Sequence, residues 1–319
     1  MTRSPNVTGA IYMTVSMAAF TFNDACVKLA SADVPLFQLV FLRGLLTTIM
    51  LTAVVWAMGR LSFVIPRQDL PKVIGRTIAE IASLVCFLLA LINMPLANVT
   101  AILGALPLTV TLAAAVFLRE PIGWKRMLAI LVGFVGVLLI VQPGTDGFNA
   151  YALLALLAVV FITARDLFTR QLSSQVPSMT VAVITAAAVC VFGGAMSVTE
   201  TWQPLDLRSM ALIAAASVFI IGAYVFSIMV MRVGDIGYVA PFRYTSLVFA
   251  LVLGWAAFGD WPNALTLIGG GIVVATGLFT LLREQRVARR VGRSPASPTA
   301  TAVAAAPVAG PRIGAGPGD

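Results

Sequence analysis

Runs of about 20 mostly apolar residues recur along the chain, and they constrain its fold more than any other feature. A helix of that length rises about 30 Å, which is the thickness of the hydrocarbon core of a bilayer. The chain is 60% hydrophobic and 11% charged, whereas a soluble domain is about 25% charged. The sequence therefore predicts an all-α integral membrane protein.

Ten such runs predict ten transmembrane helices, and short connections with turn residues join several of them. Ten helices use most of the 319 residues, so no room remains for a soluble catalytic domain. The expected spans are 9–28, 36–58, 71–92, 97–118, 124–141, 149–169, 178–199, 209–231, 236–258 and 264–282.

The basic residues predict the orientation of these spans. The net charge is +8, but Lys and Arg fall mostly in the connections, which is typical of topology signals rather than of a nucleic-acid surface. With residues 1–8 in the cytoplasm, the outer side holds only Lys28 and Arg208, so both termini are expected to be cytoplasmic. The inner side then holds Arg3, Arg60, Arg67, Lys72, Arg76, Arg119, Lys125, Arg126, Arg170, Arg232, Arg283, Arg286, Arg289, Arg290 and Arg293.

The two ends of the chain differ from its apolar body. Segment 283–319 starts basic, and from about Ser294 it is rich in Ala, Pro and Gly, so we expect a tail that becomes disordered. At the N-terminus, Arg3 and the Ala-Ser-Ala sequence at 30–32 resemble a signal peptide with its cleavage site. Polar residues just before that site favour a first span that is retained.

Residue types that serve metals, nucleophiles and ATP are scarce. The sequence has no His, and Cys26, Cys86 and Cys190 lie far apart inside apolar runs, as buried small hydrophobes do. It contains no phosphate-binding GxxxxGK[ST] loop and no dense group of Asp and Glu. We therefore expect no cofactor, no metal and no ATP-driven pumping.

The second half of the chain repeats the first. Segment 23–35 aligns with 165–177 at an offset of 142 residues, and 117–141 aligns with 257–282 at nearly the same offset. Two regions with one offset indicate a duplication of five spans. Matched residues are Asp24 with Asp166, Lys28 with Arg170, Pro35 with Pro177, Glu120 with Asp260, and Gly136 with Gly277. The two copies cover residues 9–141 and 149–282.

Five spans is an odd number, so the second copy enters the membrane from the opposite side and the repeats are predicted to be inverted. Asp24 and Lys28 then lie at the outer end of the first span, and Asp166 and Arg170 lie at the inner end of the sixth. Residues four apart share a helix face, so each pair is expected to neutralise itself. The pairs are either interfacial ion pairs or a gate or pivot.

Several segments resemble one known family. They are the polar end of the first span, Phe41–Gly44, 118–144 and 240–262. Together with the duplication, they make residues 9–282 similar to the EamA branch of the drug/metabolite transporter superfamily. The resemblance implies two inverted five-helix halves, a cavity lined by spans 1, 3, 4, 6, 8 and 9, and alternating access.

The same resemblance implies a multi-pass protein of the bacterial inner membrane, whose partners are a small-molecule substrate and membrane lipid, with no nucleic acid. Family members move amino acids, nucleotide-like cofactors, vitamins or drugs, inward or outward. Segments 23–28 and 240–245 look most like bacterial uptake transporters for riboflavin and S-adenosylmethionine. Riboflavin uptake is the expectation. S-adenosylmethionine uptake and the efflux of amino acids or drugs are the alternatives.

Three charges inside predicted spans are candidate functional groups, because a charge at the centre of a membrane helix costs about 2.5–3.5 kcal/mol. Glu80 is expected to bind a cationic group or a coupling proton, or to pair with Arg43 or Arg243. Arg243 follows Pro241, where the helix is expected to break. With Tyr244 it suits an anionic or flat ligand, and the alternative is snorkelling. Arg43 lies outside the implied cavity and is expected to be structural.

Uncharged residues supply further candidates. Asn23, Asn98 and Tyr238 lie near the ends of the implied lining spans and are substrate-binding candidates, with helix caps or interfacial anchors as the alternative. The glycines of 133–136 and 269–271 allow close helix approach, which predicts a packed pair of spans 5 and 10 or a homodimer contact.

Two other classes of function compete with a secondary transporter. An integral-membrane lipid-modifying enzyme needs a nucleophile or a metal cluster near one face, and the sequence shows neither. A channel or a receptor needs no duplication with matched charges. The sequence therefore favours a transporter and not an enzyme.

Overall fold

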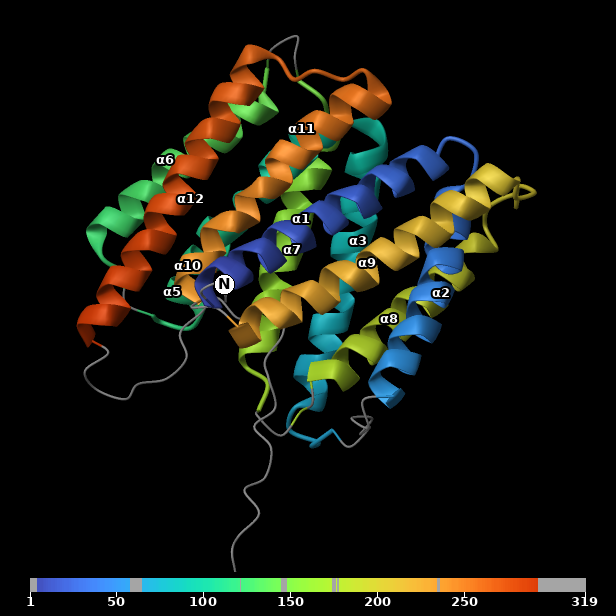
Figure 1. The fold of residues 1–319 in the computed structure, drawn as a ribbon, viewed down its shortest axis with the longest axis horizontal. Coiled ribbons are helices and arrows are strands. Elements are labelled where there is room, and N and C mark those ends of the chain that lie inside the picture. Colours follow the sequence, from blue (N-terminus) through green and yellow to red (C-terminus); the bar gives the residue numbers. More distant parts are fainter. Residues whose placement is uncertain are drawn as a thin grey trace, which may run out of the picture.

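The computed structural model describes residues 5–57, 65–120, 122–144, 148–173, 176, 178–233 and 236–291, and these parts contain helices and no strand. Figure 1 shows the helices gathered in one bundle. The elements are α1 (Pro5–Ala30), α2 (Leu36–Ala57), α3 (Leu70–Asn93), α4 (Leu96–Leu103), α5 (Leu106–Phe117), α6 (Trp124–Val141), α7 (Tyr151–Arg170), α8 (Ser178–Ser197), α9 (Leu207–Val233), α10 (Ile236–Val239), the 3₁₀ helix η1 (Ala240–Tyr244), α11 (Thr245–Phe258) and α12 (Ala264–Val291).

Nine spans in the described part of the chain are long and apolar enough to cross a membrane. Helix α1 is not among them, although it has 26 residues, because Asn23, Asp24 and Lys28 lower its hydropathy. The prediction of ten spans is therefore reproduced for nine of them by length and hydropathy. The tenth is a helix of membrane-spanning length with a polar end.

Two predicted spans are interrupted rather than continuous. The predicted span 97–118 divides into α4 and α5 at Gly104 and Ala105, next to Pro107 in the first turn of α5. The predicted span 236–258 divides into α10, η1 and α11, and the break that Pro241 predicts is confirmed there.

The C-terminal helix is longer than predicted. Helix α12 continues to Val291, nine residues beyond the expected end at 282, so the start of the basic segment is helical. The disorder expected from Ser294 onward lies outside the described residues.

The main helix pairs join one half of the chain to the other. Helix α1 packs on α9, α3 on α7, α2 on α8, and α6 on α12. Figure 1 places the α6–α12 pair at one edge of the bundle and the α2–α8 pair at the opposite edge. In the duplication, α1, α2, α3 and α6 correspond to α7, α8, α9 and α12. Exchanging each helix for its counterpart therefore turns the α1–α9 contact into the α7–α3 contact. The same exchange leaves the two edge pairs unchanged.

Glycines bring both edge pairs into close contact. A Cβ added at Gly136 would lie 2.8 Å from the Gly269 carbonyl oxygen, and one added at Gly269 would lie 2.5 Å from the Gly136 oxygen. Only glycine allows this approach, and it confirms the predicted scaffold pair of α6 and α12. Gly193 of α8 packs in the same way against the backbone of Phe41 in α2, a contact that the sequence did not reveal.

Polar contacts between connections show which connections share one end of the bundle. The amide end is defined by connections 31–35, 94–95, 142–144 with 148–150, 198–206 and 259–263, and side-chain amides join several of them. Asn149 Nδ2 donates to the Asn93 carbonyl at 3.0 Å, and Gln142 Nε2 donates to Asn263 Oδ1 at 2.9 Å. Gln38 exchanges hydrogen bonds of 2.8 and 2.9 Å with the Gln203 backbone.

The opposite end, the basic end, contains the described residues 65–69, 118–120, 122–123, 171–173 and 176 of three connections. Asp69 begins α3 there, and its side chain is fully buried. The hydrogen bonds from Ser173 and Lys72 hold the pKa of Asp69 below its usual value. This contact therefore stabilises the fold above the pKa of the unfolded chain and is lost as the pH falls through the folded value.

Candidate functional site

Charged and polar side chains from both halves meet inside the bundle. They come from α1, α2, α3, α7, α9 and η1, so residues that are far apart in the sequence share one site. Two of them, Glu80 and Arg165, keep 20% and 22% of their side chains exposed. We call the group the core polar cluster; its members are Asn23, Asp24, Arg43, Arg76, Glu80, Arg165, Asp166, Tyr224 and Arg243.

Arg165 of α7 organises the half of the cluster that α3 and α7 supply. Its Nη1 lies 3.0 Å from Glu80 Oε2, and its Nε and Nη2 lie 2.9 and 2.8 Å from Asp166 Oδ1. One guanidinium thus holds two carboxylates, which is the geometry that makes arginine suited to buried ion pairs. The partner predicted for Glu80 was Arg43 or Arg243, and Arg165 takes that place.

The other half of the cluster comes from α1 and α2. Asn23 Nδ2 donates to Asp24 Oδ1 at 2.9 Å, and Arg43 Nη1 donates to Asn23 Oδ1 at 3.2 Å. The Arg43 charge also interacts with Asp24 and Glu80. Arg43 was expected to lie outside the site, but it connects the two halves of the cluster.

Tyr224 of α9 adds a partly exposed aromatic ring to the cluster. The Tyr224 side chain is 38% exposed, yet its hydroxyl interacts electrostatically with charges on α2, α3 and α7, including Arg43, Glu80 and Arg165. The ring also packs edge-on against Phe20 of α1, with 5.6 Å between centroids. An exposed aromatic face surrounded by groups from several helices can accept a flat molecule.

Two arginines complete the cluster and differ in their contacts. Arg76 donates to the hydroxyls of Thr169 on α7 and Thr185 on α8. Arg243 interacts electrostatically with Asp166, but among the described residues its side chain makes no hydrogen bond and no ion pair. Its guanidinium is therefore the donor most available to an anionic group.

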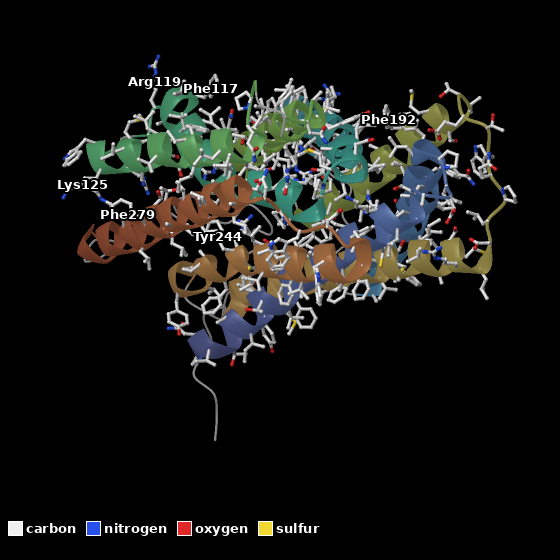
Figure 2. All side chains as sticks on the ribbon, turned by 90° about the horizontal axis from the view of Figure 1, so that it is seen from above. Phe117, Arg119, Lys125, Phe192, Tyr244 and Phe279 are labelled. Carbon is white, nitrogen blue, oxygen red and sulfur yellow. The ribbon has the colours of Figure 1, made fainter. Side chains whose placement is uncertain are left out.

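Three other predicted site residues lie apart from the cluster. Tyr244 points its hydroxyl at Gly277 of α12, and Figure 2 shows it between α12 and α11. Tyr238 is 43% exposed beside Phe242. The Asn98 Oδ1 atom is buried without a hydrogen-bond partner in the described structure. Their roles in binding stay predictions, and the geometry does not bring Tyr244 together with Arg243 as expected.

The expected ion pair within α1 is wrong. Lys28 instead reaches across the amide end to Asp260, at 3.9 Å, and donates to the Met94 carbonyl. Its ammonium also lies 5.0 Å from the centroid of the Phe258 ring. Asp24, its predicted partner, belongs to the core polar cluster, so Lys28 joins α1 to the connection between α11 and α12.

A matching contact occurs at the basic end. Arg170, the counterpart of Lys28, lies 3.7 Å from Glu120, the counterpart of Asp260. It joins α7 to the connection between α5 and α6, while Asp166 lies in the cluster. The two terminal ion pairs, Lys28–Asp260 and Arg170–Glu120, therefore occupy equivalent positions at opposite ends.

Sequence reasoning missed three cluster members. Arg76 was assigned to the inner connections, and Tyr224 has no charge to mark it. Arg165 lies within the predicted span 149–169 but was not named as a site residue, although it precedes Asp166 and aligns with the candidate Asn23. A charge at the position of a candidate residue in the other repeat was the signal that could have identified it.

The groups of the cluster are suited to binding a polar solute. Within the described residues, no three His, Cys, Asp or Glu side chains are placed to hold a metal ion. The site offers three carboxylates, four guanidiniums and an aromatic ring, which can bind polar groups of a solute.

Comparisons with known proteins agree with this geometry. The model of the EamA-like transporter family matches the chain twice, at residues 7–142 and 149–282. The pseudopaline exporter of Pseudomonas aeruginosa is 29% identical over 85% of this chain and 95% of its own length. The riboflavin transporter of Vibrio cholerae is 28% identical over 62% of this chain and 66% of its own length. The S-adenosylmethionine uptake transporter of Rickettsia conorii is 23% identical over 89% and 96%.

One solved crystal structure has a similar fold, with a TM-score of 0.62 and 17% identity over 88% of this chain and 99% of that one. The relatives named above are transporters and not enzymes. Together with the double match of the family model, they show that the chain belongs to the EamA-like transporter family and is a multi-pass membrane transporter.

Proposed function

We propose that the chain is a secondary transporter of the bacterial inner membrane that moves a small organic solute by alternating access. The observation that carries this proposal is the core polar cluster, in which charged groups from both halves meet inside the bundle. Our first candidate for the solute is a flat vitamin or cofactor such as riboflavin, taken up by the cell.

The two halves are proposed to be inverted repeats, 9–141 and 149–282. The exchange symmetry of the helix pairs supports this, as does the match of one family model to each half. The basic end is proposed to face the cytoplasm with both termini, because Lys and Arg are retained on that side. Arg67, Lys72, Arg119 and Lys125 lie at this end, against Lys28 and Arg208 at the other.

The terminal ion pairs are proposed to be the gates. Each joins a helix of one half to a connection of the other, so separating the halves at one end must break the pair there. Opening outward breaks Lys28–Asp260 and keeps Arg170–Glu120, and opening inward does the reverse. Asp24 and Asp166, predicted as gate residues, act in the core polar cluster in this scheme.

Recognition of the solute is assigned to the cluster. Tyr224 and Phe20 offer ring surfaces for stacking, and Arg243 offers a donor to a carbonyl or an anionic group. Glu80 exchanges its contact with Arg165 for a donor group of the solute or for a coupling proton. Riboflavin fits this set because it combines a flat ring system with carbonyl acceptors.

Replacing Glu80 by Gln tests the proposal. We expect Glu80→Gln to abolish riboflavin uptake into proteoliposomes while the protein stays folded, because Arg165 keeps Asp166 as its partner. Asp33→Asn is the matched control, since Asp33 is an exposed carboxylate at the amide end. Uptake at the wild-type rate by a folded Glu80→Gln protein would remove Glu80 from the mechanism.

A second candidate function is export, and the pseudopaline exporter supports it through its match over 95% of its own length. Transport assays in right-side-out and inside-out vesicles distinguish uptake from export. Uptake predicts riboflavin accumulation in right-side-out vesicles, and export predicts it in inside-out vesicles. If only one of riboflavin and S-adenosylmethionine raises the melting temperature of the protein, that solute is the better candidate.

A further inference from the structure

A second cationic group lies away from the core, where the start of α6 meets α12 at the basic end. The Arg283 guanidinium of α12 lies over the first turn of α6, with Nη2 3.7 Å from the position that a Cβ at Gly123 would take. Its Nη1 atom is buried and has no hydrogen-bond partner among the described residues. A buried guanidinium donor is unfavourable until it meets an acceptor, and an anion is the acceptor it binds best.

The neighbours of Arg283 are also cationic. Arg126 lies close enough for the two guanidiniums to repel each other, and the nearby carboxylate of Glu120 is engaged with Arg170. Arg119 and Lys125 are exposed at the same end of the bundle, as Figure 2 shows. Among the described side chains, Arg126 and Arg283 thus share one nearby carboxylate that already has a partner, and Lys125 adds a further charge on the first turn of α6, so an anionic ligand would be favoured there.

The local backbone adds to this charge. Helix α6 has 18 residues, and no side chain caps its N-terminus at Gly123, so its first N–H groups and the positive end of its dipole face the same place. The sequence of α12 continues with Arg286, Arg289 and Arg290. Clusters of four to eight basic residues directly cytoplasmic of a membrane helix are typical of binding to anionic lipids.

Aromatic side chains place these cations next to the bilayer. Phe117 of α5 is 73% exposed, Trp124 of α6 is 70% exposed and Phe279 of α12 is 47% exposed; Trp124 adjoins Lys125, and Phe279 lies four residues before Arg283. Figure 2 shows Phe117 and Phe279 at the same end as Arg119 and Lys125. Exposed aromatic rings beside basic residues are characteristic of the membrane–water interface. A ligand there meets cations on one side and apolar surface on the other.

We propose that Lys125, Arg126 and Arg283, the α6–α12 basic site, bind the phosphate headgroup of an anionic phospholipid in the leaflet at the basic end. The adjoining apolar surface favours a lipid over a free phosphate ion, because it receives the acyl chains. The site lies on the scaffold pair of α6 and α12, so it does not depend on the proposed solute or on the direction of transport.

The test uses the full-length protein in detergent with added phosphatidylglycerol, phosphatidylcholine or inorganic phosphate. Native mass spectrometry measures lipid binding, and the melting temperature measures stabilisation. We expect phosphatidylglycerol to bind more tightly than phosphatidylcholine and to raise the melting temperature further. The double variant Lys125→Gln/Arg283→Gln should weaken its binding by roughly tenfold or more, since each basic residue near the surface contributes measurably. Arg208→Gln, at the amide end, should leave the affinity unchanged.

Three results would overturn the site. They are equal binding of the two lipids, an unchanged affinity in the double variant, and full stabilisation by inorganic phosphate alone. If the double variant does not fold, Lys125→Gln replaces it, because this side chain is exposed. Arg283→Lys keeps the charge and should retain most of the affinity.

Discussion

Helices α1 and α7 occupy equivalent places in the two halves, but their polar ends have different chemistry. Each carries an aspartate at the same position, Asp24 or Asp166. The residue before it is Asn23 in α1 and Arg165 in α7. The Asn23 amide oxygen accepts a hydrogen bond from Arg43 of α2. Arg165 instead binds two carboxylates, those of its neighbour Asp166 and of Glu80 on α3.

The duplication therefore places equivalent residues at equivalent positions, and a single difference, Asn23 against Arg165, determines which side of the cluster carries the additional guanidinium. The α1–α2 side pairs one carboxylate with one arginine through an amide, and the α3–α7 side holds two carboxylates on one guanidinium. The α3–α7 side therefore has a carboxylate that can change partners without leaving Arg165 unpaired. That asymmetry is the reason we assign coupling to Glu80 rather than to Asp24.

The largest expected effect comes from breaking the α3–α7 side. Arg165→Ala leaves Glu80 and Asp166 without a hydrogen-bonded cation inside the bundle, and breaking a buried ion pair costs about 3–5 kcal/mol. We expect a strong loss of folded protein and a marked fall in melting temperature. Arg43→Ala should cost less, because Asp24 keeps the Asn23 amide. Equal losses in the two variants would contradict the asymmetry between the halves.

A smaller effect is expected at the equivalent glycines Gly136 and Gly277. A Cβ at Gly136 meets the backbone oxygen of Gly269, which cannot move, so Gly136→Ala should destabilise the protein by about 1–3 kcal/mol. A Cβ at Gly277 meets the Tyr244 hydroxyl, which is at the end of a side chain that can rotate. Gly277→Ala should therefore lower the stability of the protein less than Gly136→Ala does. Gly271→Ala is the control, since nothing lies within 4 Å of its added Cβ. Thermal unfolding in detergent measures all three, and the reverse order of losses would count against this packing.

The smallest effect on stability is expected at the terminal ion pairs. Asp260 and Glu120 are 38% and 39% exposed, and such pairs contribute less than about 1 kcal/mol. Asp260→Asn should nevertheless make the amide end more accessible to a thiol reagent, and Glu120→Gln should do so at the basic end. If both variants increased thiol accessibility at the same end of the bundle, the two ion pairs would not be gates at opposite ends.

Much of the fold could be predicted from sequence because its rules are local. Apolar length sets the helices, the glycines of 133–136 and 269–271 set the α6–α12 contact, and Pro241 sets one break. The break between α4 and α5 was missed although Gly104 and Pro107 lie there, and the extension of α12 was missed because the prediction followed the apolar run, whereas residues 283–291 contain helix formers and no Gly or Pro.

The site was harder to predict, because its partners come from different helices. Spacing placed Asp24 and Lys28 on one helix face, but it could not show that Asp260 or Arg43 would lie closer in space. Arg165 was overlooked for the same reason, since its role depends on the contact between α3 and α7.

Thiol labelling across the membrane tests the central claim of two inverted halves most directly. In a chain with Cys26, Cys86 and Cys190 replaced, single cysteines at Asp33 and Gln171 flank the two terminal pairs on exposed positions. A membrane-impermeant maleimide applied to intact spheroplasts should label Asp33→Cys at once and Gln171→Cys only after the membrane is opened. Labelling of both from the outside would contradict the inverted repeat and the transport mechanism built on it.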